Sequence, residues 1–197
     1  MVGKGRLNKL KPINPDASKT AIENAENEVI KAIADTMDLY GVTPSIGRLY
    51  ATMYFKNEPM TLDEMKDDLG MSKPSMSTAV RKLQEIDIVQ KVWKKGSRKD
   101  LFTAEKNFFN YFSKFFGTKW EREVKLNLKA IHSAESQLQK ILDSDDTEES
   151  LKEKARQDLR QLAESKRFYD WLSRLAKTID TGEIFDFLPI EEPQNKS

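Results

Sequence analysis

The 197-residue sequence predicts a mainly α-helical fold with one small β-hairpin, and three observations support this prediction. Apolar residues recur three or four positions apart over most of the chain, which is the spacing of one helix face. A short segment, 88–103, instead contains two β-prone runs around a glycine-containing turn. Charged residues make up 33% and hydrophobic residues 38% of the chain, a balance that suits long amphipathic helices.

The N-terminal part begins with a polar, basic stretch, residues 1–18, for which we expect a flexible arm. A first helix is predicted from Ala21 to Tyr40, and Gly41 provides its C-terminal stop. A second helix is predicted from Pro44 to about Phe55.

Two further helices joined by a tight turn are predicted next. Thr61 and Glu64 fit a capping box, in which each side chain accepts a hydrogen bond from the backbone N–H of the other residue. Gly70 ends this helix, Ser72 caps the next one, and Pro74 lies in the first turn, where its missing N–H is harmless. The helix that follows runs to about Ile86, and its buried stripe is predicted to be Met76, Ala79, Val80 and Leu83.

The β-prone runs are Ile88–Lys94 and Lys99–Thr103, and the turn 95–98 between them predicts a hairpin. Helical periodicity returns from Glu105 to about Leu142. An acidic run interrupts it, and a last helix is predicted from Ser150 to Ile179. The tail after Gly182 is acidic, and we expect it to be irregular.

The order helix, tight turn, helix and basic hairpin is that of a winged helix-turn-helix. Between Lys73 and Lys99 there are eight basic and two acidic residues, a net charge of +6 in a chain whose total is +1. Such a local basic patch is typical of a polyanion-binding face. Small hydroxyl side chains let a helix enter a major groove, and arginine pairs with guanine or phosphate. The predicted DNA-binding residues are Ser72, Lys73, Ser75, Ser77, Thr78, Arg81, Lys82, Lys94, Lys95, Arg98 and Lys99.

The stretch from Thr61 to Phe109 resembles the winged helix of MarR-type regulators, and most closely the GbsR-like subgroup. Residues 70–93 (GMSKPSMSTAVRKLQEIDIVQKVW) resemble the recognition helix and first wing strand, and residues 96–105 (GSRKDLFTAE) carry the most distinctive wing signature. The segment IGRLYATMYF before the motif also fits, so the resemblance covers about Ala21 to Leu142.

The sequence has no apolar run long enough to span a bilayer, so we expect a cytoplasmic protein. The resemblance implies a homodimer, and two-fold symmetry predicts a near-palindromic double-stranded DNA operator. It further implies repression of genes for glycine betaine synthesis or osmoprotectant uptake, with choline, a small quaternary ammonium compound, as effector. The expected layout is a flexible arm (1–18), N-terminal helices that join the dimer platform and start the winged domain (19–58), the winged helix-turn-helix core (59–104), dimerisation helices (105–182) and an acidic tail (183–197).

A quaternary ammonium ion is held by aromatic ring faces. Tyr50, Tyr54 and Trp93 are the candidate ligand-binding residues, because their rings have polar tips and lie close to the reading unit in sequence. The aromatic run from Phe108 to Trp120 is the alternative location, although its phenylalanines also fit an ordinary helical core.

Three alternatives are open. An enzyme is disfavoured, since the chain has one histidine, His132, no cysteine and no phosphate-binding or nucleophile motif. We therefore expect no catalytic residue, cofactor, metal site or membrane contact. A MarR-type regulator with a different effector or none, or a helical adaptor that uses the winged-helix scaffold to bind protein, would also fit.

Overall fold

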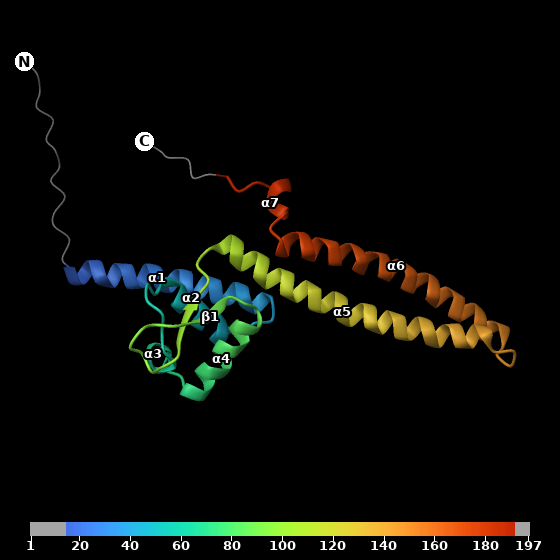
Figure 1. The fold of residues 1–197 in the computed structure, drawn as a ribbon, viewed down its shortest axis with the longest axis horizontal. Helices are drawn as coiled ribbons and strands as arrows, with labels where there is room; N and C mark the ends of the chain where they lie inside the picture. Colours follow the sequence, from blue (N-terminus) through green and yellow to red (C-terminus); the bar gives the residue numbers. More distant parts are fainter. Residues whose placement is uncertain (1–14, 192–197) are drawn as a thin grey trace, which may run out of the picture. The chain divides into compact units, whose positions relative to one another are not determined.

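The computed structural model describes residues 15–191 and confirms the predicted fold class (Figure 1). The described residues are mainly helical and contain one two-stranded sheet in which β1 pairs with β2. The elements are α1 (Pro15–Leu39), α2 (Pro44–Phe55), α3 (Leu62–Leu69), α4 (Lys73–Glu85), β1 (Val89–Val92), β2 (Leu101–Ala104), α5 (Phe108–Asp143), α6 (Glu149–Asp180) and α7 (Ile184–Phe187).

The N-terminal helix begins earlier than predicted. Residues 1–14 of the expected arm lie outside the described residues, whereas residues 15–18 belong to α1. No helix-breaking residue lies between Pro15 and Gly41, and a proline is tolerated in a first helical turn. Asp16 adds a favourable negative charge at that end, so the helix extends beyond its apolar stripe.

The chain divides into two compact units. Within the described residues, the first comprises residues 15–83 and 91–104, and the second comprises residues 84–90 and 105–191. The chain therefore passes between the units inside α4, inside β1 and directly after β2.

In the first unit, α1 and α2 approach each other closely at Gly47. A Cβ atom on Gly47 would lie 3.0 Å from the Cα atom of Ala34 on α1. Met37 of α1 and Leu49 and Tyr50 of α2 are fully buried beside this contact region. The glycine thus permits the helix pairing that forms the core of this unit.

The helix-turn-helix follows its local sequence signals. The Thr61 hydroxyl accepts a hydrogen bond from the Glu64 N–H (3.2 Å), and the Glu64 carboxylate accepts one from the Thr61 N–H (2.7 Å), which confirms the capping box. Gly70 ends α3 in the left-handed conformation, with φ of 65°. The predicted buried stripe of α4 is confirmed as Met76, Ala79, Val80 and Leu83.

The wing strands are shorter than the predicted runs, and a backbone bridge between Met60 and Phe102 adds a short third partner to the sheet. The loop between β1 and β2 starts at Trp93, so this residue does not lie on a strand as expected. Within the loop, Gly96 has a φ of 88° and the Ser97 N–H donates to the Lys94 carbonyl (3.1 Å). The hydrogen-bonded part of β1 ends at Val92, before the charged residues that follow, because residues 94–97 form the turn.

The second unit is a long helical hairpin, in which α5 and α6 lie side by side (Figure 1). Asn107 caps α5 by accepting hydrogen bonds from the N–H groups of Phe109 and Asn110. The buried side chains of the hairpin include Phe115, Val124 and Ile131 on α5 and Ala155, Leu172, Ala176 and Ile179 on α6.

The segment after Gly182 is not wholly irregular, in contrast to the prediction, because Ile184–Phe187 forms α7. The ring of Phe185 contacts the ring of Phe109 on α5 edge to face, with centroids 5.7 Å apart. This aromatic contact explains why an acidic tail holds a helical turn here. Across the described residues, no helix is long and apolar enough to cross a membrane.

Candidate nucleic-acid interface

The predicted DNA-binding residues lie on α4, on the turn before it and on the wing loop. Ten of the eleven are exposed, and Ser77 is half-buried. This distribution follows from the α4 stripe: because Met76, Ala79, Val80 and Leu83 are buried, the opposite side of the helix is left to solvent. The exposed side carries Arg81 and Lys82, and the wing loop carries Lys95 and Arg98.

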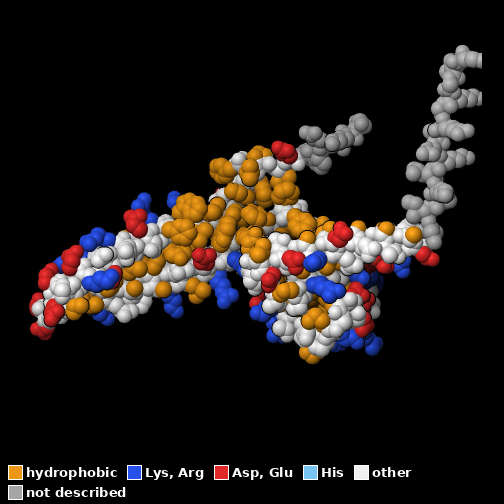
Figure 2. Space-filling view, turned by 180° about the vertical axis from the view of Figure 1, so that it is seen from behind, with side chains coloured by type: hydrophobic (Ala, Val, Ile, Leu, Met, Phe, Trp, Pro, Cys, Tyr) orange, Lys and Arg blue, Asp and Glu red, His pale blue; other side chains and the backbone are white. Residues whose placement is uncertain are grey.

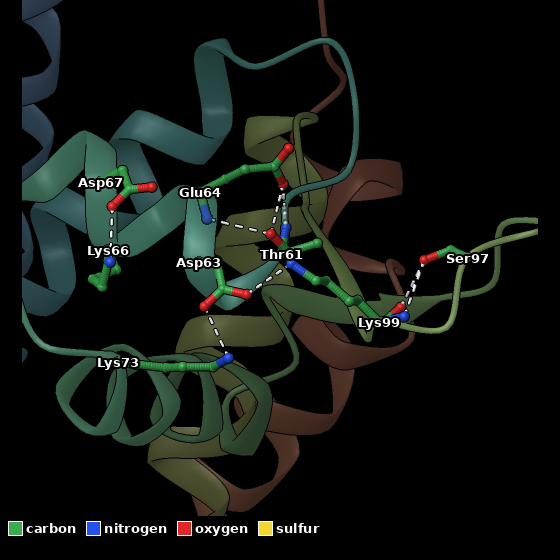
Figure 3. Close-up of polar contacts among 8 residues, drawn as sticks. All are labelled: Thr61, Asp63, Glu64, Lys66, Asp67, Lys73, Ser97 and Lys99. Carbon is green, nitrogen blue, oxygen red and sulfur yellow. Dashed lines mark hydrogen bonds and ion pairs between the residues drawn. The ribbon is translucent and has the colours of Figure 1, made fainter.

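Asp63 on α3 joins the recognition helix to the wing (Figure 3). One carboxylate oxygen accepts from Lys73 Nζ at the start of α4 (2.8 Å), and the other accepts from Lys99 Nζ of the wing (2.9 Å). The hydrogen bond from Lys73, followed by that from Lys99, lowers the pKa of Asp63 to about 2. The same contact raises the pKa of Lys99. We call this arrangement of Lys73, Asp63 and Lys99 the α3 clamp.

Sequence reasoning missed Asp63, because its acidic charge and its place in the first turn of α3 indicated only a favourable helix start. Two more wing cations are also paired with carboxylates. Lys94 contacts Glu58 at 3.0 Å, and Lys91 contacts Asp100 at 2.7 Å. Lys73, Lys94 and Lys99 are thus tied to the protein by ion pairs.

The other four basic residues of the predicted DNA-binding set are not paired with a carboxylate in the described part of the chain. Within residues 15–191, Arg81 and Lys82 on α4 and Lys95 and Arg98 on the wing make no ion pair. An exposed cation with no carboxylate partner is the type of side chain that neutralises a phosphate and releases its counterion. These four side chains therefore have the chemistry for contact with a nucleic acid.

The start of α4 is organised by hydroxyl groups. The Ser72 hydroxyl oxygen accepts from the Ser75 N–H at 3.3 Å and lies 2.8 Å from the Ser75 hydroxyl oxygen. Ser72 therefore has the capping role that the sequence predicts, and the pair leaves both hydroxyls exposed at the helix N-terminus. Free N–H groups and hydroxyls at a helix start are ordinary phosphate ligands.

The three candidate ligand-binding rings differ in their exposure to solvent. Tyr50 is completely buried in α2, whereas Trp93 in the wing loop is 92% exposed. Tyr54 is half-buried and its ring meets Phe55 edge to face. Because Tyr50 is part of the buried α1–α2 core, its ring is not accessible to a ligand in this structure, whereas Tyr54 and Trp93 are accessible.

The alternative aromatic run on α5 forms a continuous series of ring contacts. The rings of Tyr111 and Phe115 stack with centroids 5.4 Å apart, and Phe116 contacts Trp120 at 5.6 Å. Lys119 Nζ lies 5.0 Å from the centroid of Phe115, so a cation of the protein itself already uses this ring. Burial, with a smaller contribution from Arg122, lowers the pKa of Lys119.

Comparison with known proteins identifies the family. Residues 108–186, which include α5 and α6, match the family model described as "GbsR family transcriptional regulator, C-terminal helical hairpin". The HTH-type transcriptional repressor GbsR of Bacillus subtilis (strain 168) is 54% identical over 178 residues, which are 90% of this chain and 97% of that protein. The chain belongs to the GbsR family of transcriptional regulators.

A second relative of this GbsR-family protein is the HTH-type transcriptional repressor OpcR of the same organism. It is 35% identical over 168 residues, with 85% of this chain and 91% of that protein covered. A solved structure described as a crystal structure of a transcriptional regulator is 19% identical, with a TM-score of 0.48, and the match covers 78% of this chain and 99% of that chain.

Proposed function

We propose that this GbsR-family protein is a homodimeric repressor that binds a near-palindromic operator with α4 and the wing. Both relatives described above are named as repressors, and the more similar one aligns along nearly its whole length. The helix-turn-helix and wing provide the binding elements, and α1, α5 and α6 provide long surfaces on which two copies can pair.

The observation that carries this proposal is the set of unpaired cations on α4 and the wing. Arg81 and Lys82 occupy the exposed side of the recognition helix, and Lys95 and Arg98 occupy the wing tip. In this arrangement α4 reads the major groove, and the wing contacts phosphates or the neighbouring minor groove. The α3 clamp holds Lys73 and Lys99, so these lysines set the position of the wing relative to α4.

The test measures the salt dependence of binding. Fluorescence anisotropy is recorded with a promoter fragment and with a scrambled duplex for the parent, the Lys95→Ala/Arg98→Ala variant and the control Lys31→Ala, whose side chain is exposed on α1. Each lost phosphate contact should reduce the slope of log affinity against log salt by roughly 0.9. We expect the wing variant to lose about four contacts, two from each subunit of the dimer, and the control to lose none; equal slopes in all three proteins would contradict DNA contact by the wing.

We further propose that the regulated genes serve glycine betaine synthesis or osmoprotectant uptake and that choline is the effector, as the resemblance to the family implies. A quaternary ammonium ion has no N–H donor and needs aromatic faces, each contributing about 0.5–2 kcal/mol. Tyr54 and Trp93 present accessible ring surface, and the aromatic run of α5 supplies further rings. Choline releases DNA only if it binds the DNA-free form more tightly.

Titration of choline into the protein–DNA complex tests the effector. The control is potassium chloride at equal ionic strength, and the variants are Trp93→Ala, Tyr54→Ala and Phe116→Ala. We expect choline to lower the affinity for DNA and one of the aromatic variants to abolish this effect. An affinity that choline leaves unchanged would reject this effector and leave the DNA-binding role intact.

A further inference from the structure

Trp93 is the most exposed large hydrophobic side chain of the described residues, with 92% of its surface open to solvent. It begins the wing loop, directly after the last residue of β1. Within residues 15–191, its side chain takes part in no hydrogen bond, ion pair or ring contact. Figure 2 shows hydrophobic side chains gathered on the second unit but scattered among charged ones on the visible face of the first unit, to which the wing belongs. A single exposed hydrophobic residue is ordinary, so the role of Trp93 has to be inferred from its neighbours.

The neighbours of Trp93 are basic, and two of them are unpaired. The Ser97 N–H donates to the Lys94 carbonyl at 3.1 Å, and a turn of this kind keeps its end Cα atoms within about 7 Å of each other. Lys95 lies inside the turn and Arg98 directly follows it, and neither makes an ion pair within the described residues. Trp93 and Arg98 thus flank one tight turn. A nucleic acid that binds the two free cations is brought close to the ring.

Two ion pairs restrict the arms of the loop that carries the ring. Lys91, two residues before Trp93, contacts Asp100 at 2.7 Å, and Lys94, directly after it, contacts Glu58 at 3.0 Å. Each contact is exposed and weak by itself, but the two lie on either side of the ring in the chain. A loop held in this way loses less conformational freedom on binding than a free one, so it presents the ring at a lower cost in entropy.

The indole ring of Trp93 offers a flat apolar surface and one N–H donor, and it has no acceptor. In the minor groove, A·T base pairs present only acceptors, whereas G·C pairs add the amino donor of guanine. An indole in the minor groove therefore matches A·T pairs, because its donor finds an acceptor there. At a G·C pair the donor would face a second donor, and the amino group would occupy the space of the ring. Apolar side chains are known to insert into the minor groove as wedges.

We propose that Trp93 enters the minor groove next to the bases contacted by α4 and makes the wing selective for A·T over G·C pairs. This assignment rests on the DNA binding of the proposed function and adds a specificity-determining residue to it. Contacts of lysine and arginine with phosphate position a protein on DNA and carry no sequence information. The ring therefore gives the wing a reading role that its cations lack.

DNA fits this ring better than the other occupants do. A cage for a small cation needs several ring faces, and no second ring contacts Trp93 in the part of the chain that the structure describes. A protein partner would favour a contiguous apolar patch, whereas the loop around the ring is basic. The free cations Lys95 and Arg98 complement phosphate, and the α3 clamp joins the wing to the recognition helix.

Three alternating duplexes of equal length, with A·T, G·C or I·C pairs, test the assignment without knowledge of the operator. Inosine has the major-groove groups of guanine but lacks its minor-groove amino group, so the comparison of I·C with G·C isolates the minor groove. Affinities are measured by competition fluorescence anisotropy for the parent, for Trp93→Ala and for the matched control Trp171→Ala, whose ring is exposed on α6. Circular dichroism verifies that both variants are folded.

We expect the parent and Trp171→Ala to bind I·C about tenfold more tightly than G·C, the effect of a donor left without a partner. Both should also prefer A·T to G·C, whereas Trp93→Ala should bind I·C and G·C alike. Equal binding of I·C and G·C by the parent, or a Trp93→Ala variant that keeps the parent's ratio, would overturn the assignment while the DNA-binding proposal stands. A parent that binds none of the duplexes and no promoter fragment would overturn both.

The salt dependence of binding separates the ring from the cations. Trp93→Ala removes no phosphate contact, so its slope of log affinity against log salt should equal that of the parent. Lys95→Ala/Arg98→Ala should show the opposite pattern, with a smaller slope and a retained preference for I·C over G·C. A smaller slope for Trp93→Ala would show that the ring only positions the neighbouring cations, and the minor-groove role would then be wrong.

Discussion

At the scale of single residues, the candidate interface separates into cations that are fixed and cations that are available. Asp63 and Glu58 hold three lysines of the predicted set, while Arg81 on α4 keeps its guanidinium unpaired within the described residues. A fixed lysine shapes the reading unit, whereas an available arginine can make a bidentate contact with a base or a phosphate. The two classes should therefore respond differently to mutation.

We expect Arg81→Ala to reduce affinity for the operator more than affinity for random DNA. A bidentate contact with guanine contributes about 1–3 kcal/mol of discrimination, and its loss relaxes specificity at one position. Lys95→Ala should instead weaken binding to all duplexes alike, because phosphate carries no sequence information. Gel shifts with specific and random duplexes measure both ratios, and an unchanged ratio for Arg81→Ala would assign this arginine to phosphate.

The carboxyl group of Asp63 should titrate near pH 2 instead of at its usual value of 3.8. Because the pKa is lowered in the folded protein, the α3 clamp is fully charged above pH 3.8 and is lost as the pH falls through about 2. Carbon-detected NMR of the Asp63 carboxyl resonance gives the midpoint. Lys73→Gln should move the midpoint upward, and a parent value of 3.8 would show that the clamp does not form in solution.

At the scale of elements, two threonines in equivalent positions differ in their capping bonds. Thr61 makes both bonds of a capping box, whereas Thr43 at the start of α2 makes no side-chain cap hydrogen bond. Loss of an N-cap costs about 0.5–2 kcal/mol. We expect Thr61→Ala to lower the free energy of unfolding by this amount and Thr43→Ala to change it little, as measured by urea denaturation. Equal losses would refute the assigned cap.

Gly47 and Gly117 should respond in opposite ways to replacement by alanine. At Gly47 the new Cβ would meet backbone atoms of Ala34 at 3.0 and 3.2 Å, so the α1–α2 pair must separate. At Gly117 the nearest atom, on Asp180, lies at an ordinary 3.5 Å, and alanine gains about 0.5–1 kcal/mol from its helix propensity. Thermal unfolding should show a lower melting temperature for Gly47→Ala and an equal or higher one for Gly117→Ala; the reverse order would contradict the close approach.

Elements with local signals were predictable from sequence. Thr61, Glu64 and Gly70 act within one helix, and the α4 stripe follows helical spacing, so neighbouring residues determine these features. Features that join distant segments were not predictable. Lys99 is 36 residues from Asp63, and no local pattern pairs them.

The ring positions show the same limit. Helical spacing placed Tyr50 on α2, but spacing alone does not distinguish a ring in the core from one that lines a ligand site. Trp93 lies within the β-prone run Ile88–Lys94, which predicts a strand, whereas the strand ends at Val92 and the turn that contains Gly96 begins at Lys94. In α7, the long-range contact between Phe185 and Phe109 overrides the helix-poor composition of the tail.

At the scale of the whole molecule, pairing of two copies predicts both a mass and a symmetry. Light scattering at micromolar concentration should give twice the chain mass of 22.7 kDa. Two recognition helices related by a two-fold axis read half-sites about 34–36 Å apart, so scrambling either half of the operator should weaken binding equally. A monomeric mass, or one half-site that accounts for all the affinity, would contradict this assembly.

The division of the chain has a mechanical consequence. The border between the compact units falls inside α4, between Leu83 and Gln84, and no long linker separates them. The helix α4 has thirteen residues and a length of about 20 Å, and its last two residues belong to the second unit. Asp87, two residues after the end of α4, forms an ion pair with Lys114 of α5, with 3.2 Å between its carboxylate oxygen and Lys114 Nζ. A change in the second unit that alters the backbone at Gln84 and Glu85 therefore acts on the same helix that carries Arg81 and Lys82.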